Sequence, residues 1–327
     1  MELLFYRTET GNFGDDLNQW FWDEVLPGWR GWAPDTLLVG IGTILKQGFL
    51  PEGGHKLVIG SGVGYGRMPD IRADPASWDI RCVRGPRSAQ ALGLPPSLAA
   101  IDPAALLPEF GDFAGLERGD ERLFVPHYGV AEKYDWERIC AGTGITPLSP
   151  AGDPRSIICR IATARSVIAE SMHAAIIADA FRTPWQCVAV SASFNAFKWT
   201  DWAQSVGVDD LEITRFFAPL RNIQQIAGRL RGAGAAPGDA ARPAPARNAP
   251  PSGPEKSAGL LAPILAPMAR KTIKTVAARP YRLSDAAVLR ARKLHLLNIL
   301  NDVARDYGQA DSSFVRGALG AARQAAG

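Results

Sequence analysis

Four segments of the sequence combine residue types that can bind an anion or transfer a proton. The first, Thr10–Asn18, reads TGNFGDDLN and contains Asn12, Gly14, Asp15 and Asp16. Glycines let backbone N–H groups turn toward a ligand, and a carboxylate in such a loop suits a sugar hydroxyl, as acceptor or general base. The alternative for this segment is a tight turn followed by a helix cap, which uses the same residue types.

The second segment, Val83–Leu94, places Arg84 at the end of an expected strand and before a Gly-Pro turn. Ligands of open α/β sheets bind at the carboxyl ends of the strands, so a guanidinium here can reach a bound phosphate or carboxylate. Arginine holds such groups in a fork that lysine cannot match. A structural salt bridge is the alternative role for Arg84.

The third segment, Glu170–Trp185, reads ESMHAAIIADAFRTPW and contains Ser171, His173 and Arg182. We expect His173 in the first turn of an apolar helix, where the helix dipole favours a bound anion. Arg182 follows that helix. The alternative is that His173 caps the helix and that Arg182 only complements its C-terminal dipole.

The fourth segment contains His127, which also follows an expected strand, in the sequence FVPHYG. A single histidine is more often packed or exposed than catalytic, so this residue is a weaker candidate. We interpret His55 and His295 as surface residues.

Short apolar runs that end in glycine or in polar loops alternate with helical patterns along residues 1–217. Such alternation predicts parallel sheets covered by helices. The expected strands are Leu3–Tyr6, Thr36–Gly42, Lys56–Gly64, Asp79–Val83, Arg122–Val125, Ile145–Leu148, Val167–Ala169 and Pro184–Val190, and Ala99–Leu107 is expected to be a strand end followed by a turn. The expected helices are Leu17–Val25, Arg87–Leu92, Trp136–Gly142, Asp153–Ala164, Ala174–Phe181 and Asn195–Ser205.

Composition divides the chain into four parts. Residues 1–116 and 117–231 are expected to form two lobes, and residues 232–259, rich in Ala, Pro, Gly and Arg, a flexible linker. Residues 260–327 form a basic tail with two expected helices, Leu260–Ala278 and Ser284–Tyr307, the second capped by Ser284. Residues 259–327 contain eleven Lys and Arg against four Asp, a net charge of +7, which leaves −4 for the rest of the chain.

The same composition argues against several classes of protein. The acidic balance of the body gives no support for nucleic-acid binding. No secretory signal and no long apolar span are visible, so a cytoplasmic protein is expected. The four cysteines form no CxxC pair and we expect them to be reduced, with no metal site.

Together the four segments resemble the polysaccharide pyruvyl transferase family, in particular the ketal pyruvate transferases of acidic exopolysaccharide synthesis such as succinoglycan. The similarity covers about residues 3–217, through GNFGDDLN, VRGPRSAQALGL with IDPAALL, VPHYG and ESMHAAIIADAFRTPW. The resemblance implies two Rossmann-like lobes that face a cleft, as in GT-B glycosyltransferases. It also implies phosphoenolpyruvate as co-substrate, with no further cofactor, and a sugar acceptor that is often a lipid-linked oligosaccharide.

On this basis Arg84, His127, His173 and Arg182 are expected around the donor, and Asp15 and Asp16 near the acceptor. Asn12, Gly14 and Ser171 are expected to contribute to substrate binding. Many family members have Ser-Arg-Leu-His where this chain has Ser171-Met172-His173, so an arginine is missing and Arg182 is the expected substitute.

Ketal formation requires protonation of the methylene carbon of phosphoenolpyruvate and attack by two sugar hydroxyls. A histidine can supply the proton, and the two candidates are His173 and His127. The alternative activity is a GT-B-type glycosyltransferase that uses a nucleotide sugar, and a further alternative is a non-catalytic scaffold. For the tail, we expect either a peripheral contact with the inner face of the plasma membrane or packing against the body.

Overall fold

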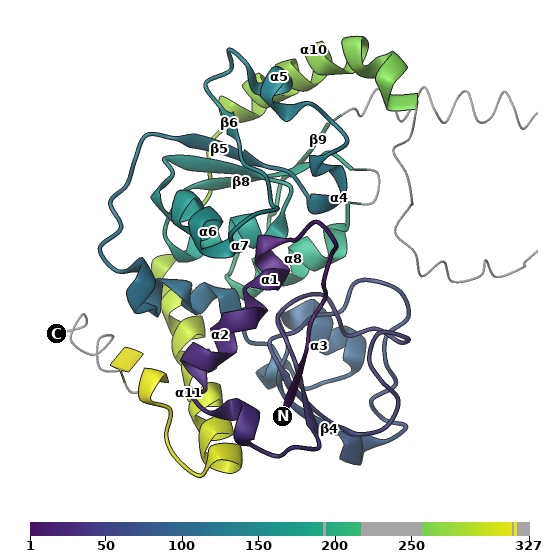
Figure 1. The fold of residues 1–327 in the computed structure, drawn as a ribbon, viewed down its shortest axis with the longest axis vertical. Coiled ribbons are helices and arrows are strands. Elements are labelled where there is room, and N and C mark those ends of the chain that lie inside the picture. The colour runs from purple at the N-terminus through teal and green to yellow at the C-terminus, as the bar shows by residue number, and fades with distance from the viewer. Residues whose placement is uncertain (192–193, 217–256, 316, 319–327) are drawn as a thin grey trace, which may run out of the picture.

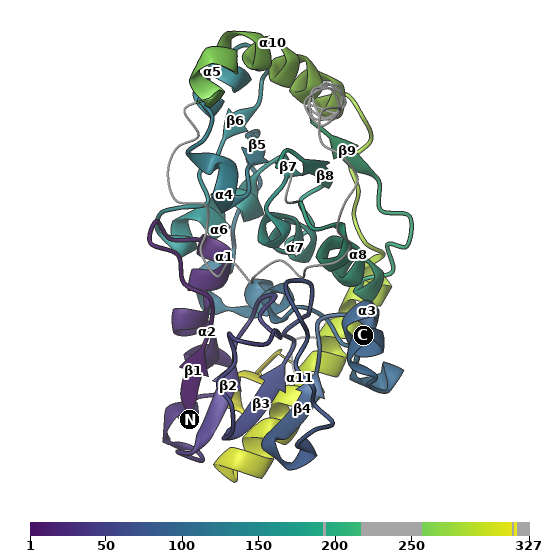
Figure 2. The ribbon, with the colours of Figure 1, turned by 90° about the vertical axis from the view of Figure 1, so that its right-hand side faces the viewer.

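The computed structural model describes residues 1–191, 194–216, 257–315 and 317–318. The described residues form an α/β protein with two sheets, and every pair of neighbouring strands within them is parallel. Figure 2 shows the two sheets one above the other. The expected α/β class with two parallel sheets is therefore confirmed.

The first sheet has the strand order β1-β2-β3-β4 and lies within residues 1–116. Its two central strands are short and mostly buried, as is usual for parallel sheets, whereas the two edge strands are only partly buried. The strands are β1 (Glu2–Leu4), β2 (Thr36–Val39), β3 (His55–Ile59) and β4 (Trp78–Cys82), and the helices of this part are α1 (Phe13–Asp16), α2 (Asn18–Val25), α3 (Pro86–Leu92) and the 3₁₀ helices η1 (Trp29–Gly31), η2 (Pro75–Ser77), η3 (Pro96–Leu98), η4 (Pro103–Glu109) and η5 (Gly111–Phe113).

The second sheet has the order β6-β5-β7-β8-β9, so its first strand along the chain, β5, lies between β6 and β7. The expected strands are found with ends that differ by up to about five residues, except for the strand end at Ala99–Leu107, and β9 was not predicted from the sequence. The strands are β5 (Arg122–Val125), β6 (Thr146–Pro147), β7 (Ser166–Ala169), β8 (Trp185–Ala189) and β9 (Ile213–Arg215), and the helices are α4 (Tyr128–Ala131), α5 (Trp136–Cys140), α6 (Pro154–Thr163), α7 (Met172–Ala180) and α8 (Ala196–Ser205).

Two expectations for local structure were wrong. Residues Ala99–Leu107 were expected to be a strand end and a turn, but only an isolated bridge between Ala99 and Val83 forms there, followed by η4. The cap of the last long helix is Asp285, whose carboxylate accepts from two backbone N–H groups. Ser284 instead faces inward and donates from its hydroxyl to Asp179.

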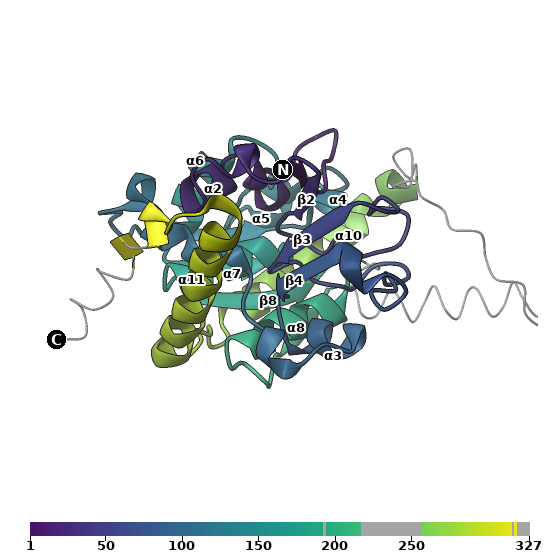
Figure 3. The same cartoon turned by 90° about the horizontal axis from the view of Figure 1, so that it is seen from below.

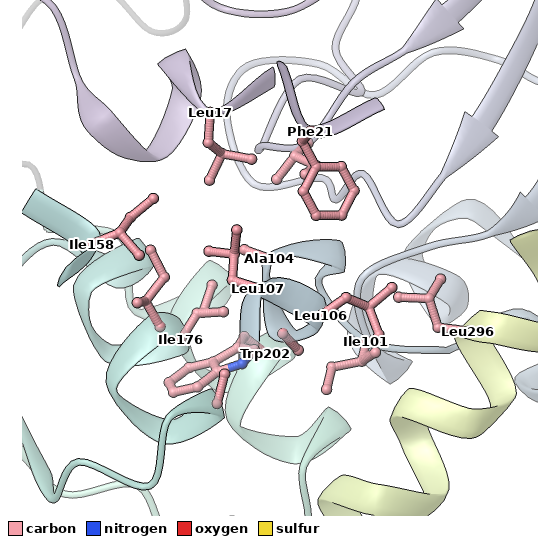
Figure 4. Packing of buried hydrophobic residues seen from close by; sticks show 14 of the residues in the cluster. Leu17, Phe21, Ile101, Ala104, Leu106, Leu107, Ile158, Ile176, Trp202 and Leu296 are labelled. Atoms are coloured by element: carbon pink, nitrogen blue, oxygen red, sulfur yellow. The ribbon is translucent and has the colours of Figure 1, made fainter. Parts of the chain in front are cut away.

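One hydrophobic cluster contains residues from both lobes (Figure 4). Leu17, which directly precedes α2, and Phe21 of α2 lie opposite Ile158 of α6. Leu107 of η4 lies between them. The packing of η4 on α7 and of α1 on α6 joins the first lobe to the second. Because interiors are close-packed, this shared core fixes the loops of one sheet against those of the other.

The tail forms two helices, α10 (Ser257–Ala277) and α11 (Ala286–Gly308), that lie at different places on the body (Figure 1). Helix α10 packs on α5, and Arg270 donates to the carbonyl groups of Arg138 and Ile139. Helix α11 runs alongside β4, as Figures 2 and 3 show, and Tyr307 donates to Asp79. Most of the expected linker lies outside the described residues, and no helix among those described is long and apolar enough to cross a membrane.

Candidate active site

A cavity of about 230 Å³ lies where the two lobes meet. Its walls come from the loops that follow the carboxyl ends of strands in both sheets, the usual location of ligand sites in open α/β folds. Residues of the first lobe that line it are Tyr6, Asn12, Asp15, Thr43, Ile44, Lys46 and Tyr65, and those of the second lobe are His127, Tyr128, Ser171, Met172, His173 and Lys198.

Asp15 is the buried carboxylate of the cavity. It lies in the first turn of α1, and its Oδ2 accepts a hydrogen bond of 2.6 Å from Asn12 Nδ2. Burial raises the pKa of Asp15 to about 7, although the hydrogen bond from Asn12 and the charge of Lys198 oppose this shift. A carboxyl group with this pKa can accept a proton near neutral pH.

His173 lies in the first turn of α7, which begins directly after β7 and Ser171. Its imidazole packs on Gly14 so closely that a side chain at position 14 would overlap the ring. Nε2 is buried without a hydrogen-bond partner and lies 3.8 Å from Oδ2 of Asp102. Burial lowers the pKa of His173 to about 3, with smaller contributions from Lys198 and Arg84, so the ring is neutral at pH 7.

His127 lines the same cavity from the loop after β5. Its Nδ1 accepts from the backbone N–H of Gly129 and caps the short helix α4, while the backbone N–H of His127 donates to the carboxylate of Glu170. Burial lowers the pKa of His127 to about 3, with a smaller contribution from Lys198. The buried Glu170 carboxylate also accepts from the N–H groups of residues 190 and 191, and so ties together the loops after β5, β7 and β8.

Two lysines supply positive charge to the cavity. Lys198 lies in the first turn of α8 and is buried, with its ammonium 5.2 Å from the centre of the Tyr65 ring. Lys46 enters from the first lobe, with its ammonium 5.8 Å from the centre of the Tyr6 ring. Neither lysine forms an ion pair with a residue in the described part of the chain.

Five of the nine candidate residues line the cavity, namely Asn12, Asp15, His127, Ser171 and His173. Gly14 lies one layer behind, against His173. Asp16 accepts from the backbone N–H of Asn12 and from Gln19, and stabilises the loop.

Arg84 and Arg182 are not among the lining residues. The guanidinium of Arg84 is fully buried and pairs with Asp201 at 3.0 Å, which is the salt bridge left open as its alternative role. It also donates to Thr43, which does line the cavity. Arg182 lies at the opposite end of α7 from His173, where it donates to the side chain and the carbonyl of Ser284.

Several residues at the site were not singled out from the sequence. Asp102 belongs to the IDPAALL segment, and its position at the end of an expected strand was a usable signal. Lys198 stands in a helix with Trp199 and Trp202, a pattern typical of a buried helix, and nothing in the sequence separates it from other basic residues. Lys46 and Thr43 follow β2 and have no motif of their own.

Comparisons with known proteins identify the family of the chain. The family model described as polysaccharide pyruvyl transferase matches residues 12–191, more than half of the chain and a range that holds Asp15, His127 and His173. The chain belongs to the polysaccharide pyruvyl transferase family.

A curated member of related sequence is the succinoglycan biosynthesis protein ExoV of Rhizobium meliloti (strain 1021). It is 49% identical over 208 residues, which are 64% of this chain and 66% of that protein. The match thus spans just under two thirds of the relative's length. No solved structure matches the chain.

Proposed function

We propose that this family member is an enzyme that transfers the pyruvyl group of phosphoenolpyruvate onto a sugar and forms a pyruvate ketal. The acceptor is a sugar of an exopolysaccharide or of a lipid-linked oligosaccharide. The observation that carries the proposal is the composition of the cavity, in which two lysines, two histidines and one carboxylate of raised pKa meet between the lobes. Membership of the family and the relation to a succinoglycan biosynthesis protein support it.

Donor binding follows from charge. Phosphoenolpyruvate carries a phosphate and a carboxylate, and Lys198 and Lys46 are cations without an ion-pair partner among the described residues. Lys198 takes the place of the arginine that many family members have before the histidine. The N–H groups at the start of α7, next to Ser171, add a favourable dipole for the phosphate.

Proton transfer follows from the positions of His173 and Asp15. A bound phosphate raises the pKa of His173, and the imidazolium then donates a proton to the methylene carbon as an acceptor hydroxyl bonds to the adjacent carbon. Asp15 accepts the proton of that hydroxyl. A second hydroxyl then displaces phosphate and closes the ketal, and its proton leaves with the phosphate. His127 lines the same cavity and replaces His173 as the acid if the donor binds in the opposite orientation.

The cavity also suggests how the lobes work together. In the proposed GT-B-like arrangement, residues 1–116 present the acceptor side through Asn12 and Asp15, and residues 117–231 present the donor side through His173 and Lys198, with Lys46 reaching the donor from the first lobe. The parallel sheets place these groups at strand ends on both sides of one cavity, which supports this arrangement.

A lipid-linked acceptor would bring the protein to the cytoplasmic face of the plasma membrane as a peripheral protein. The tail supports this part of the proposal through its basic charge. Lys271 and Lys274 are exposed on α10, whereas Ala269, Ile273 and Val276 on its other face are buried against the second lobe. Each basic residue near an anionic leaflet contributes about 1 kcal/mol to binding.

A donor assay tests the activity. The full chain is incubated with lipid-extracted oligosaccharides and with either ¹⁴C-labelled phosphoenolpyruvate or labelled nucleotide sugars. We expect label to reach the acceptor, and phosphate to be released, only from phosphoenolpyruvate. Transfer from a nucleotide sugar would instead support a glycosyltransferase, and no transfer by a folded protein from either donor would support a scaffold.

Vesicle binding tests the proposed location. We expect the full chain to sediment with vesicles that contain anionic lipid, and Lys271→Glu/Lys274→Glu to reduce this binding. Lys133→Glu, an exposed change on the same lobe, is the matched control. Equal binding of the parent and the double variant would contradict docking through α10.

A further inference from the structure

Asp102 and His173 hold two buried polar atoms that lack partners and face each other. Oδ2 of Asp102 and Nε2 of His173 both have no hydrogen bond, and they lie 3.8 Å apart. Asp102 is fully buried, and Nε2 is closed to solvent. Buried polar atoms are nearly always hydrogen-bonded, and leaving one unpaired costs about 1–3 kcal/mol. Two such atoms side by side therefore call for a functional explanation.

The backbone around Asp102 fixes where its free oxygen lies. The other carboxylate oxygen, Oδ1, accepts a bond of 3.0 Å from the N–H of Ala104, so Asp102 caps the 3₁₀ helix η4. That helix packs on α7, the helix that carries His173. The cap uses one oxygen and leaves Oδ2 directed at the imidazole.

The roles of the two atoms are complementary. Nε2 can carry a proton and donate, and a carboxylate oxygen can only accept unless it is protonated. A shift of about 1 Å would bring the pair into ordinary hydrogen-bond range, and catalytic hydrogen bonds are often long in unliganded enzymes. Because Nε2 is closed off, Nδ1, which packs against Gly14 on one side, is the nitrogen left to exchange a proton with a ligand in the cavity.

We propose that Asp102 is a positioning residue for His173, whose Nε2–H it accepts when the donor binds, so that Nδ1 is the proton-transferring atom. The inference rests on the proposed pyruvyl transfer. During that reaction the Nδ1–H bond of the imidazolium breaks as the new C–H bond forms at the methylene carbon. The Nε2 proton stays with His173 throughout, and Asp102 neither gains nor loses a proton.

The charges around the ring agree with this role. Arg84 and Lys198 face His173 and oppose its protonation, while Asp15 and Asp102 are the carboxylates of the same cluster. Burial raises the pKa of Asp102 to about 6, against the influence of Arg84, so at pH 7 Asp102 is mostly ionised and able to accept. A donor phosphate that neutralises Lys198 leaves Asp102 to stabilise the imidazolium.

The variant Asp102→Asn removes the proposed positioning of His173 but keeps the cap of η4. Its side-chain oxygen can still cap η4, because Asn is as good a cap as Asp, but its amide presents N–H groups to Nε2–H instead of an acceptor. We expect kcat to fall about 100-fold or more, since acid–base catalysis contributes about that much. The KM for phosphoenolpyruvate should stay within about threefold of the parent, because no donor contact is removed.

The pH profile gives a readout that a purely structural role would not change. The reaction needs the imidazolium, so kcat of the parent falls as pH rises above the pKa of His173 in the complex. Removing the carboxylate lowers that pKa, and the falling limb should move to lower pH by one unit or more in Asp102→Asn. Asp153→Asn, which alters the cap of α6 away from the cavity, is the matched control and should behave as the parent.

The tautomer of His173 can be measured without Asp102→Asn and without turnover. In ¹⁵N-histidine NMR spectra of the full-length parent at pH 7, with the signal assigned through His173→Gln, we expect the proton of the neutral ring on Nε2. A proton on Nδ1, or an Asp102→Asn enzyme with the parent's kcat and pH profile, would overturn the inference. If the donor assay failed but the Nε2–H tautomer were observed, the proposed reaction would be refuted. The pairing of Asp102 with His173 would still stand.

Discussion

Gly14 packs directly against the imidazole of His173, and a Cβ at position 14 would overlap Nδ1 and Cγ of that ring. The contact joins α1 of the first lobe to α7 of the second. The second glycine of the GNFGDD segment is therefore required because the imidazole approaches the backbone closely, and not because the backbone adopts an unusual conformation there. The two sequence segments that first suggested chemistry are thus in contact through their smallest residue.

Gly14→Ala is therefore expected to lower kcat at least 100-fold, because the added methyl group displaces the ring that transfers the proton. Gly111→Ala is the control, since nothing lies within 4 Å of a Cβ built there. Initial rates with phosphoenolpyruvate, measured well below the melting temperature of each variant, test this. Parent-like rates in Gly14→Ala would show that His173 is not held by this contact or does not take part.

Lys198→Met is expected to raise the KM for phosphoenolpyruvate at least tenfold while the protein stays folded. A lost hydrogen bond to a charged group costs about 1.5–3 kcal/mol, which corresponds to a factor of about ten or more. Lys271→Met removes an exposed lysine of α10 and serves as the control. If both variants had the parent's KM, the donor would have to bind elsewhere in the cavity.

Asp15→Asn is expected to abolish transfer and to stabilise the protein at pH 8. Folding raises the pKa of Asp15 from 3.8 to about 7, so the buried charge lowers stability progressively as pH rises through this range. This pKa shift corresponds to a loss of about 4 kcal/mol in the free energy of unfolding above pH 7 and to no loss below pH 4. Thermal melts at pH 4 and pH 8 should show the gain only at the higher pH, and an equal gain at both would contradict the raised pKa.

The elements and five of the residues that line the cavity were predictable from the sequence because both depend on local patterns. Buried parallel strands are short apolar runs, and polar residues that follow them must gather at one edge of a sheet, as His127 and His173 do. Asp15 was recognisable for the same reason. These predictions needed only the order of residues along the chain.

What the sequence did not show depends on contacts between distant segments. Arg84 follows a strand as expected, but its pairing with Asp201 comes from the packing of α3 on α8. Lys198 lies beyond the recognised segments, and only the fold brings it to the cavity. The shared core explains why α11 belongs to the body, since Leu296 and Leu300 of the tail are buried in it.

The ion pair between Arg84 and Asp201 yields a prediction that distinguishes a role of Arg84 in donor binding from a role in folding stability. Arg84→Ala leaves the buried carboxylate of Asp201 with Ser88 as its one hydrogen-bond partner among the described residues, which should cost about 3–5 kcal/mol of folding free energy. Arg84→Met combined with Asp201→Asn removes both charges and should recover most of that loss, as urea unfolding can measure.

The double variant then decides the role of the guanidinium. Arg84 is fully buried and already pairs with Asp201 and Thr43, so we expect the KM for phosphoenolpyruvate in the refolded double variant to stay within about threefold of the parent. A tenfold rise in KM together with recovered stability would instead mean that Arg84 turns toward the donor when it binds. Arg182→Ala, at the far end of α7, should leave KM unchanged and lower stability through the lost contacts to Ser284.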